Sequence, residues 1–161
     1  MHRLTCIAAI AFALAACGRS EPAAPTTSAS STSASSAAAS TSATIGGVTL
    51  QTSTVAIADL NDAVAQRYGI DRAREGVLLL VTVRDAAGNA AEPGDLQLTA
   101  TAGTLTDPPK PLELRGIRTE GMTDYIGVFH ATPPASVQFR LTATRGGSRA
   151  EIATTAELYP R

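Results

Sequence analysis

Few side chains in this sequence could bind a metal ion. Apart from His2, the one histidine is His130, and both cysteines, Cys6 and Cys17, lie within the first 17 residues. A transition-metal site usually needs two or more His or Cys ligands. The thioether of Met122 could assist in binding soft copper, but one His and one Met do not make a copper site. We therefore expect no metal site and no cofactor, and we interpret His130 as a polar residue near a strand end.

Catalysis would need a nucleophile held beside a base. His130 with Ser136 could form such a pair, which leaves a hydrolase as a remote alternative, but no G-x-S-x-G motif supports it. The one tight pair of acids, in "DLND" at 59–62, is better explained by helix capping than by calcium binding. We therefore expect no catalytic residue and predict that the protein is not an enzyme.

Two arginines form the candidate binding surface. Arg115 and Arg118 lie near a strand end, with Glu113 and Glu120 beside them. Two guanidinium groups could make a fork for a carboxylate or a phosphate. The favoured interpretation is a solvated face paired with the neighbouring acids, in which each pair contributes little.

The overall composition excludes one class of partner. The net charge is −1, and the sequence has no Trp, three Tyr and three Phe. Proteins that bind nucleic acid usually present a basic surface or aromatic side chains on which bases stack. We therefore expect no nucleic-acid partner.

Residues 1–16 have the layout of a secretory signal peptide. Arg3 supplies a positive charge, residues 4–14 form an apolar run, and Ala15 and Ala16 are small. The run is shorter than the roughly 20 apolar residues that span a bilayer. These features predict export from the cytoplasm.

The residues Leu14-Ala15-Ala16-Cys17 resemble the lipobox of bacterial lipoproteins. The resemblance implies cleavage between Ala16 and Cys17 and attachment of lipid to Cys17, which would anchor the chain to the membrane stably. It also implies a cell-envelope location facing the periplasm, in the outer membrane of a Gram-negative host because Gly18 follows the cysteine. Two alternatives stay open. Ordinary cleavage after Ala15 would leave a soluble periplasmic protein, and an uncleaved segment would remain as an anchor.

Residues 18–44 are almost entirely Ser, Thr, Ala and Pro. Such a segment cannot bury enough apolar surface to offset the entropy of ordering it. We therefore predict three parts: the signal peptide at 1–16, the lipidated Cys17 with a disordered linker at 17–44, and a folded domain at 45–161.

Alternating apolar and polar residues dominate the domain. "GVLLLVTVRD" at 76–85 is instead continuously apolar, which is typical of a central buried strand. Turn signals such as "RGGS" at 145–148 recur at short spacing. The expected strands cover 48–51, 76–85, 95–103, 112–118, 124–131, 136–144 and 150–159. This pattern predicts an all-β fold, a seven-stranded immunoglobulin-like β-sandwich.

One segment departs from the β pattern. In residues 59–69, apolar side chains recur at helical spacing, Asp59 or Asn61 can cap the first turn, and Gly69 can end the helix. We predict one short helix between the first two strands.

Three stretches resemble a family of small secreted bacterial proteins known only as domain of unknown function 4426. They are "AVAQRYGIDRAREGVLLLVTVRD", "LELRGIRTEGMTDYIGVFHA" and "FRLTATRGGSRAEIATTAELYPR". The resemblance covers roughly residues 48–161 and implies an envelope location and a β-sandwich. It implies no activity.

These observations favour a non-enzymatic lipoprotein whose domain is tethered in the cell envelope and contacts another envelope protein. Sandwich edges can accept a strand from a partner, which is one mode of contact. The alternatives are a small-ligand-binding or complex-stabilising subunit and, from another class, the hydrolase using His130.

Overall fold

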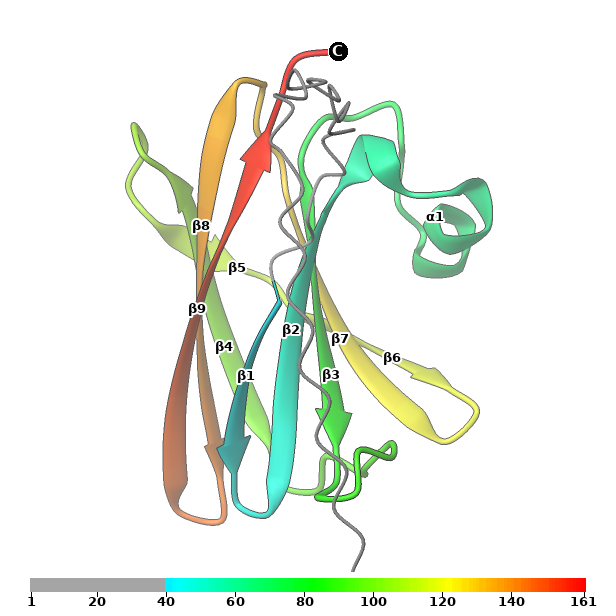
Figure 1. Ribbon diagram of the computed structural model, residues 1–161, viewed down its shortest axis with the longest axis vertical. Coiled ribbons are helices and arrows are strands. Elements are labelled where there is room, and N and C mark those ends of the chain that lie inside the picture. The colour runs from blue at the N-terminus through cyan, green and yellow to red at the C-terminus, as the bar shows by residue number, and fades with distance from the viewer. Residues whose placement is uncertain (1–39) are drawn as a thin grey trace, which may run out of the picture. The chain divides into compact units, whose positions relative to one another are not determined.

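The computed structural model describes residues 40–161, and the structural statements below concern that part of the chain. It contains nine strands, one short 3₁₀ helix and one α-helix (Figure 1). In chain order they are β1 (Ser40–Ile45), β2 (Val48–Ala56), η1 (Ile57–Asp59), α1 (Asp62–Tyr68), β3 (Val77–Arg84), β4 (Gln97–Thr104), β5 (Lys110–Leu112), β6 (Arg115–Thr119), β7 (Met122–Phe129), β8 (Ala135–Arg145) and β9 (Ser148–Leu158).

The strands form two sheets that pack face to face. The first has the order β1-β2-β3-β7-β6 and the second has the order β5-β4-β8-β9. Every pairing between named strands is antiparallel. The all-β prediction is therefore confirmed, but the number of strands is nine rather than seven.

The first additional strand is β1, whose residues 40–44 the sequence assigns to the linker. β1 pairs with β2 across a turn in which Gly46 and Gly47 have φ of 51° and 82°, as a tight type I′ hairpin requires. The Thr52 hydroxyl donates a hydrogen bond to the Thr41 carbonyl at 3.0 Å. Hydrogen bonds to β2 hold this polar strand in the sheet. The folded domain therefore includes residues 40–44, which the composition of the sequence assigned to the linker.

The second additional strand arises because the strand expected over 112–118 is two strands in different sheets. β5 pairs with β4 in the second sheet, whereas β6 pairs with β7 in the first. The chain crosses between the sheets at Glu113 and Leu114. Leu112 and Leu114 both contact the core, so the alternation continues through the crossing and does not reveal it.

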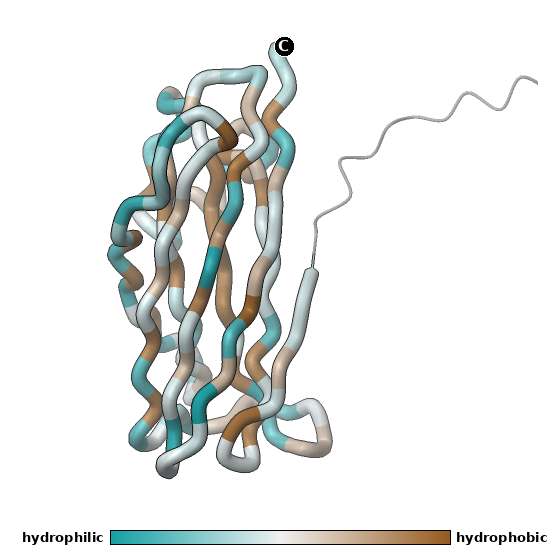
Figure 2. Tube along the Cα trace, turned by 90° about the vertical axis from the view of Figure 1, so that its left-hand side faces the viewer, coloured by the Kyte–Doolittle hydropathy of each residue, from teal (hydrophilic) through white to brown (hydrophobic). Residues whose placement is uncertain are grey.

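The core lies between the two sheets. Hydrophobic and hydrophilic residues alternate along the strands (Figure 2), as expected when one face of each strand is buried. Phe139 is 1% exposed and packs edge-to-face on Phe129, with ring centroids 6.5 Å apart. The core faces of β3 and β8 supply Val77, Leu79, Val81, Val83, Val137, Phe139, Leu141 and Ala143.

The outer face of β3 is also covered, which explains its continuous apolar run. Leu78 packs with Ile126 of β7 and with Leu60 and Ala65 of the segment containing α1. The prediction of a central buried strand is therefore correct: its two faces bury side chains in two separate clusters.

The helix lies between β2 and β3, the first two strands expected from the sequence. The Asn61 side chain accepts a hydrogen bond from the Val64 N–H at 2.8 Å, which identifies the cap that the sequence left open. Gly69 has φ of 64°, and the N–H groups of Gly69 and Ile70 donate to the carbonyls of Gln66 and Ala65. This pattern is a Schellman motif, which terminates the helix. Within residues 40–161, no helix is long and apolar enough to cross a membrane.

Candidate functional site

Three connections between strands lie at one end of the sandwich, called the loop end below (Figure 1). They are residues 57–76 between β2 and β3, 105–109 between β4 and β5, and 130–134 between β7 and β8; the C-terminal residues 159–161 lie there too. At the opposite end, three of the four connections are two-residue turns, and the fourth is the longer segment 85–96 between β3 and β4. Loops held by a rigid scaffold carry binding and catalytic residues disproportionately often, so the loop end is the candidate location of a functional site.

His130 lies at the loop end, directly after β7, and lines two hollows described below. Its Nδ1 lies 3.0 Å from the Glu75 carbonyl oxygen. A carbonyl only accepts hydrogen bonds, so Nδ1 is the donor in this contact. This contact depends on Gly76, where a Cβ atom would lie 2.4 Å from the Phe129 carbonyl oxygen.

One hollow of about 510 Å³ lies on the side of His130 formed by the β4–β5 and β7–β8 connections. Leu105, Lys110, Phe129 and Ser136 are among its lining residues. The Ser136 hydroxyl donates to the Glu157 carboxylate at 2.7 Å. Among the hydrogen bonds of residues 40–161, none joins Ser136 to His130, so the nucleophile and base suggested by the sequence are not paired.

A second hollow of about 390 Å³, the α1-side hollow, lies on the other side of His130. Its lining combines apolar side chains with charges of both signs. The apolar residues are Ile70, Ile126 and Val128, and the charged ones are Asp71, Arg74, Glu113 and Arg115. The set comes from four places in the chain: the α1–β3 connection, the crossing between β5 and β6, β6 itself, and β7. No local motif in the sequence could therefore reveal it.

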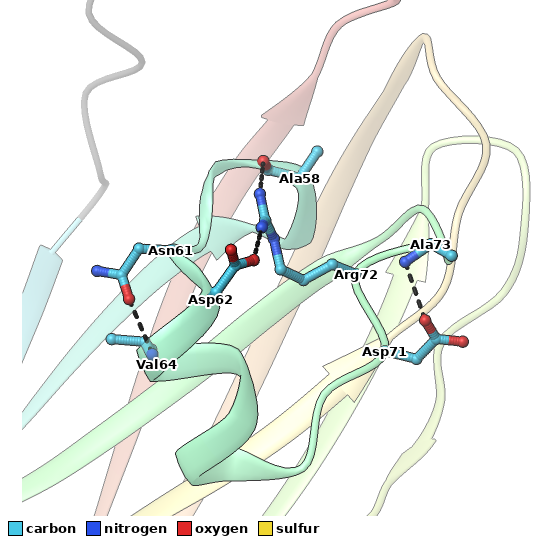
Figure 3. Close-up of polar contacts among 7 residues, drawn as sticks. All are labelled: Ala58, Asn61, Asp62, Val64, Asp71, Arg72 and Ala73. Carbon is cyan, nitrogen blue, oxygen red and sulfur yellow. Dashed lines mark hydrogen bonds and ion pairs between the residues drawn. The ribbon is translucent and has the colours of Figure 1, made fainter.

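The α1–β3 connection lines one side of this hollow, and polar contacts hold it in place (Figure 3). Arg72 reaches back to the Asp62 carboxylate and to the Ala58 carbonyl oxygen. The Asp71 carboxylate accepts a hydrogen bond from the Ala73 N–H at 2.9 Å. These contacts hold Asp71 and its neighbours beside the hollow.

Arg115 and Arg118 do not form a fork. Arg115 pairs with Ile126 and Arg118 with Thr123, so the two arginines lie on opposite faces of β6. Their spacing of three residues already indicates this in a continuous strand. The Arg115 guanidinium donates to the Tyr68 carbonyl at the end of α1, where a positive charge is favourable.

Arg118 lies on the face of β6 that also holds Tyr125 of β7. Burial raises the pKa of Tyr125, and the positive charge of Arg118 partly opposes that rise. Arg115 therefore contacts the end of α1, whereas Arg118 influences Tyr125 on the opposite face of β6.

Met122 is distant from His130. The two residues bracket β7, eight positions apart, which corresponds to roughly 26 Å of extended strand. They cannot share a metal ion. In the described part of the chain, no group of three or more His, Cys, Asp or Glu side chains is arranged to hold one.

The predicted cleavage and lipidation residues, Ala16 and Cys17, lie outside the described residues, as do the signal peptide and residues 17–39 of the linker.

Comparison with known proteins identifies one family. The model of the family described as domain of unknown function (DUF4426) matches residues 42–161. A crystal structure of a DUF4426 family protein from Pseudomonas aeruginosa PAO1 is 18% identical, with a TM-score of 0.58 over 76% of this chain and 96% of that one. FetP from uropathogenic E. coli strain F11, recombinantly expressed in the periplasm of E. coli, is 11% identical, with a TM-score of 0.51 over 76% and 95%. At these identities the likeness shows the fold alone. No curated protein matches the chain.

Proposed function

The chain belongs to the DUF4426 family, a domain of unknown function, and from its own surface we propose that it is a non-enzymatic binding module of the cell envelope. Lipid on Cys17, after cleavage between Ala16 and Cys17, would anchor it facing the periplasm, in the outer membrane of a Gram-negative host. Ordinary signal cleavage would instead make it a soluble periplasmic protein. Its partner would be another envelope protein.

One observation carries this proposal: within residues 40–161, the two most exposed large apolar side chains lie at the same end of the sandwich. Leu105 is 74% exposed and Tyr159 is 69% exposed, and both belong to the loop end. The two hollows beside His130 open there too. Aromatic side chains such as Tyr159 are enriched at the centres of protein–protein interfaces, and Leu105 adds apolar surface beside one hollow. The loop end is therefore the proposed contact surface.

The strand order supports an immunoglobulin-like arrangement. The run β2-β3-β7-β6 follows the order A-B-E-D of such domains, and β4-β8-β9 follows C-F-G. β1 and β5 would then be additions at the sheet edges. With this mapping, the B–C and F–G connections that form the binding loops of variable domains are residues 85–96 and 146–147, at the opposite end. The loop end is therefore proposed from its own exposed side chains and hollows.

The polar contacts at the loop end support a role without catalysis. Ser136 donates its hydroxyl hydrogen bond to the Glu157 carboxylate and not to His130. A hydrolase would need Ser136 to leave Glu157 and pair with His130. The second candidate function, small-ligand binding, is favoured by the mixed lining of the α1-side hollow.

Site-specific photocrosslinking in intact cells tests the proposed contact. A photoreactive amino acid replaces Leu105 or Tyr159 in the full chain, and Ser148, exposed in the turn region at the opposite end, is the control position. We expect both loop-end positions to capture the same envelope protein and Ser148 to capture none. Absence of crosslinks from the loop end, or equal capture from Ser148, would overturn the proposal.

A further inference from the structure

The α1-side hollow has the volume and the partly apolar lining of a site for a small molecule. Its volume of about 390 Å³ falls within the range of small-ligand pockets. Ile126 is 3% exposed and packs in the cluster that includes Ile70 and Val128. Ile70 and Val128 are half-buried and give the hollow an apolar surface suited to an aliphatic group, with Ile126 packed beneath them.

Two guanidinium groups of this hollow lack a carboxylate partner. Within residues 40–161, Arg74 makes no side-chain hydrogen bond and no ion pair. Arg115 donates to the Tyr68 carbonyl, which orients the guanidinium, and within residues 40–161 it makes no ion pair with a carboxylate. A planar guanidinium binds a carboxylate through two parallel hydrogen bonds. The hollow therefore offers donors to a carboxylate.

The same hollow also offers acceptors for a positively charged group. The Glu113 carboxylate lines it, and Asp71 uses only its Oδ1 atom in the bond to the Ala73 N–H. His130 also lines the hollow. An ammonium group has three donors and no acceptor, so it matches this set.

We propose that the α1-side hollow binds a free α-amino acid with an apolar side chain. A simple anion would face the carboxylates of Asp71 and Glu113, and a simple cation would face Arg74 and Arg115. A zwitterion satisfies both sets, and its aliphatic side chain covers the apolar floor. This inference rests on the second candidate function, small-ligand binding, and names its ligand class.

Calorimetric titration of the full chain, purified in detergent, tests the ligand class. The probes are leucine, N-acetylleucine, leucinamide and glycine. We expect leucine to bind. N-acetylleucine lacks the ammonium group, leucinamide lacks the carboxylate, and glycine lacks the aliphatic side chain. Each of these three should bind at least about tenfold more weakly, because a charge-assisted hydrogen bond or a buried aliphatic group is lost. N-acetylleucine resembles a peptide carboxyl terminus and leucinamide an amino terminus. Equal binding of either, or no binding of leucine, would overturn the proposal.

A matched pair of variants tests the location. Arg74→Gln removes a free guanidinium from the hollow, and we expect it to weaken leucine binding at least about tenfold. Arg67→Gln removes an exposed arginine of α1 that does not line the hollow, and it should leave binding unchanged. Thermal unfolding of both variants checks that they remain folded. Unchanged binding by a folded Arg74→Gln would overturn the assignment.

Native mass spectrometry of the chain purified from its host separates this inference from the function it rests on. A bound amino acid supports both. A different bound small molecule keeps small-ligand binding and overturns the amino-acid assignment. Crosslinking from Leu105 and Tyr159 reports on the partner contact alone.

Discussion

Gly127 of β7 lies directly against Leu112 of β5. A Cβ atom on Gly127 would come within 2.8 Å of the Leu112 Cδ2 and within 3.0 Å of the Leu114 Cδ2. The missing side chain therefore leaves the space in which the chain crosses from the second sheet to the first. This contact connects the two sheets and positions Glu113 and Arg115 beside the α1-side hollow.

We expect Gly127→Ala to destabilise the domain by about 1–3 kcal/mol, because the added methyl group overpacks the core at the crossing. The free energy of unfolding in urea measures the effect. Gly116→Ala is the matched control in a neighbouring strand, since its Cβ atom would meet Tyr125 at an ordinary 3.6 Å. The control should change stability by less than about 0.5 kcal/mol. Equal losses in the two variants would contradict the packing argument.

We expect Asn61→Ala to lower the free energy of unfolding by about 1 kcal/mol, because the Val64 N–H loses its acceptor at the start of α1. Chemical denaturation measures the loss. Gln66→Ala, at an exposed position of the same helix, should have little effect. A loss from the Gln66 variant as large as that from the Asn61 variant would show that the cap is not the cause.

Arg118→Gln should raise the pKa of Tyr125 further, because the Arg118 cation opposes the rise caused by burial. Arg115→Gln should leave this pKa unchanged, since Arg115 lies on the opposite face of β6. Titration of Tyr125 by NMR or by tyrosinate absorbance distinguishes the two variants. The same response in both would contradict the placement of the arginines on opposite faces.

Asp85 should make the domain sensitive to acid. Its pKa lies below the ordinary value of 3.8, mainly because the Asn89 N–H donates to its carboxylate, with a further bond from the Ala87 N–H and partial desolvation opposing the shift. The unfolded chain therefore takes up the proton first as the pH falls. The stabilisation is complete well above pH 3.8 and is lost as the pH drops through the lower pKa of the folded state.

Urea midpoints measured between neutral pH and about pH 3 test this expectation. Asp85→Asn should be less stable at neutral pH and should lose less stability on acidification. Glu92→Gln removes a carboxylate of the same β3–β4 connection that takes no part in these hydrogen bonds, and it should follow the wild-type profile. An Asp85→Asn profile as steep as the wild type would contradict the role of Asp85.

Lipidation of Cys17 predicts a specific mass. We expect the mature N-terminal peptide to begin at Cys17 and to be heavier by its acyl groups, as measured by mass spectrometry. Cys17→Ser should not be processed at this site. An unmodified mature peptide that begins at another residue would contradict lipidation and favour the soluble periplasmic protein.

Several features could be predicted because they depend on neighbouring residues. Alternation over 95–103 and 136–144 predicts strands that the structure forms as β4 and β8. Gly146 and Gly147 predict a hairpin turn and have φ of 54° and 76°. Helical spacing with an Asn cap and a terminal Gly predicts α1. Each signal reports a local backbone preference or the burial of one face of an element.

Other features could not be predicted because they depend on distant pairings. Alternation shows which side chains face a core but not which sheet a strand joins, so residues 112–118 read as one strand although β5 and β6 belong to different sheets. β1 is polar, and its pairing with β2 rather than its composition defines it.

The candidate site also depends on distant pairings that local sequence patterns do not reveal. The sequence by itself determined an all-β domain with one capped helix, because backbone propensities and the period of burial act over a few residues. Only the tertiary structure brought His130 to the Glu75 carbonyl and placed Arg74 and Arg115 around one hollow. Strand pairing and the crossing between the sheets set those distances, and they join residues tens of positions apart.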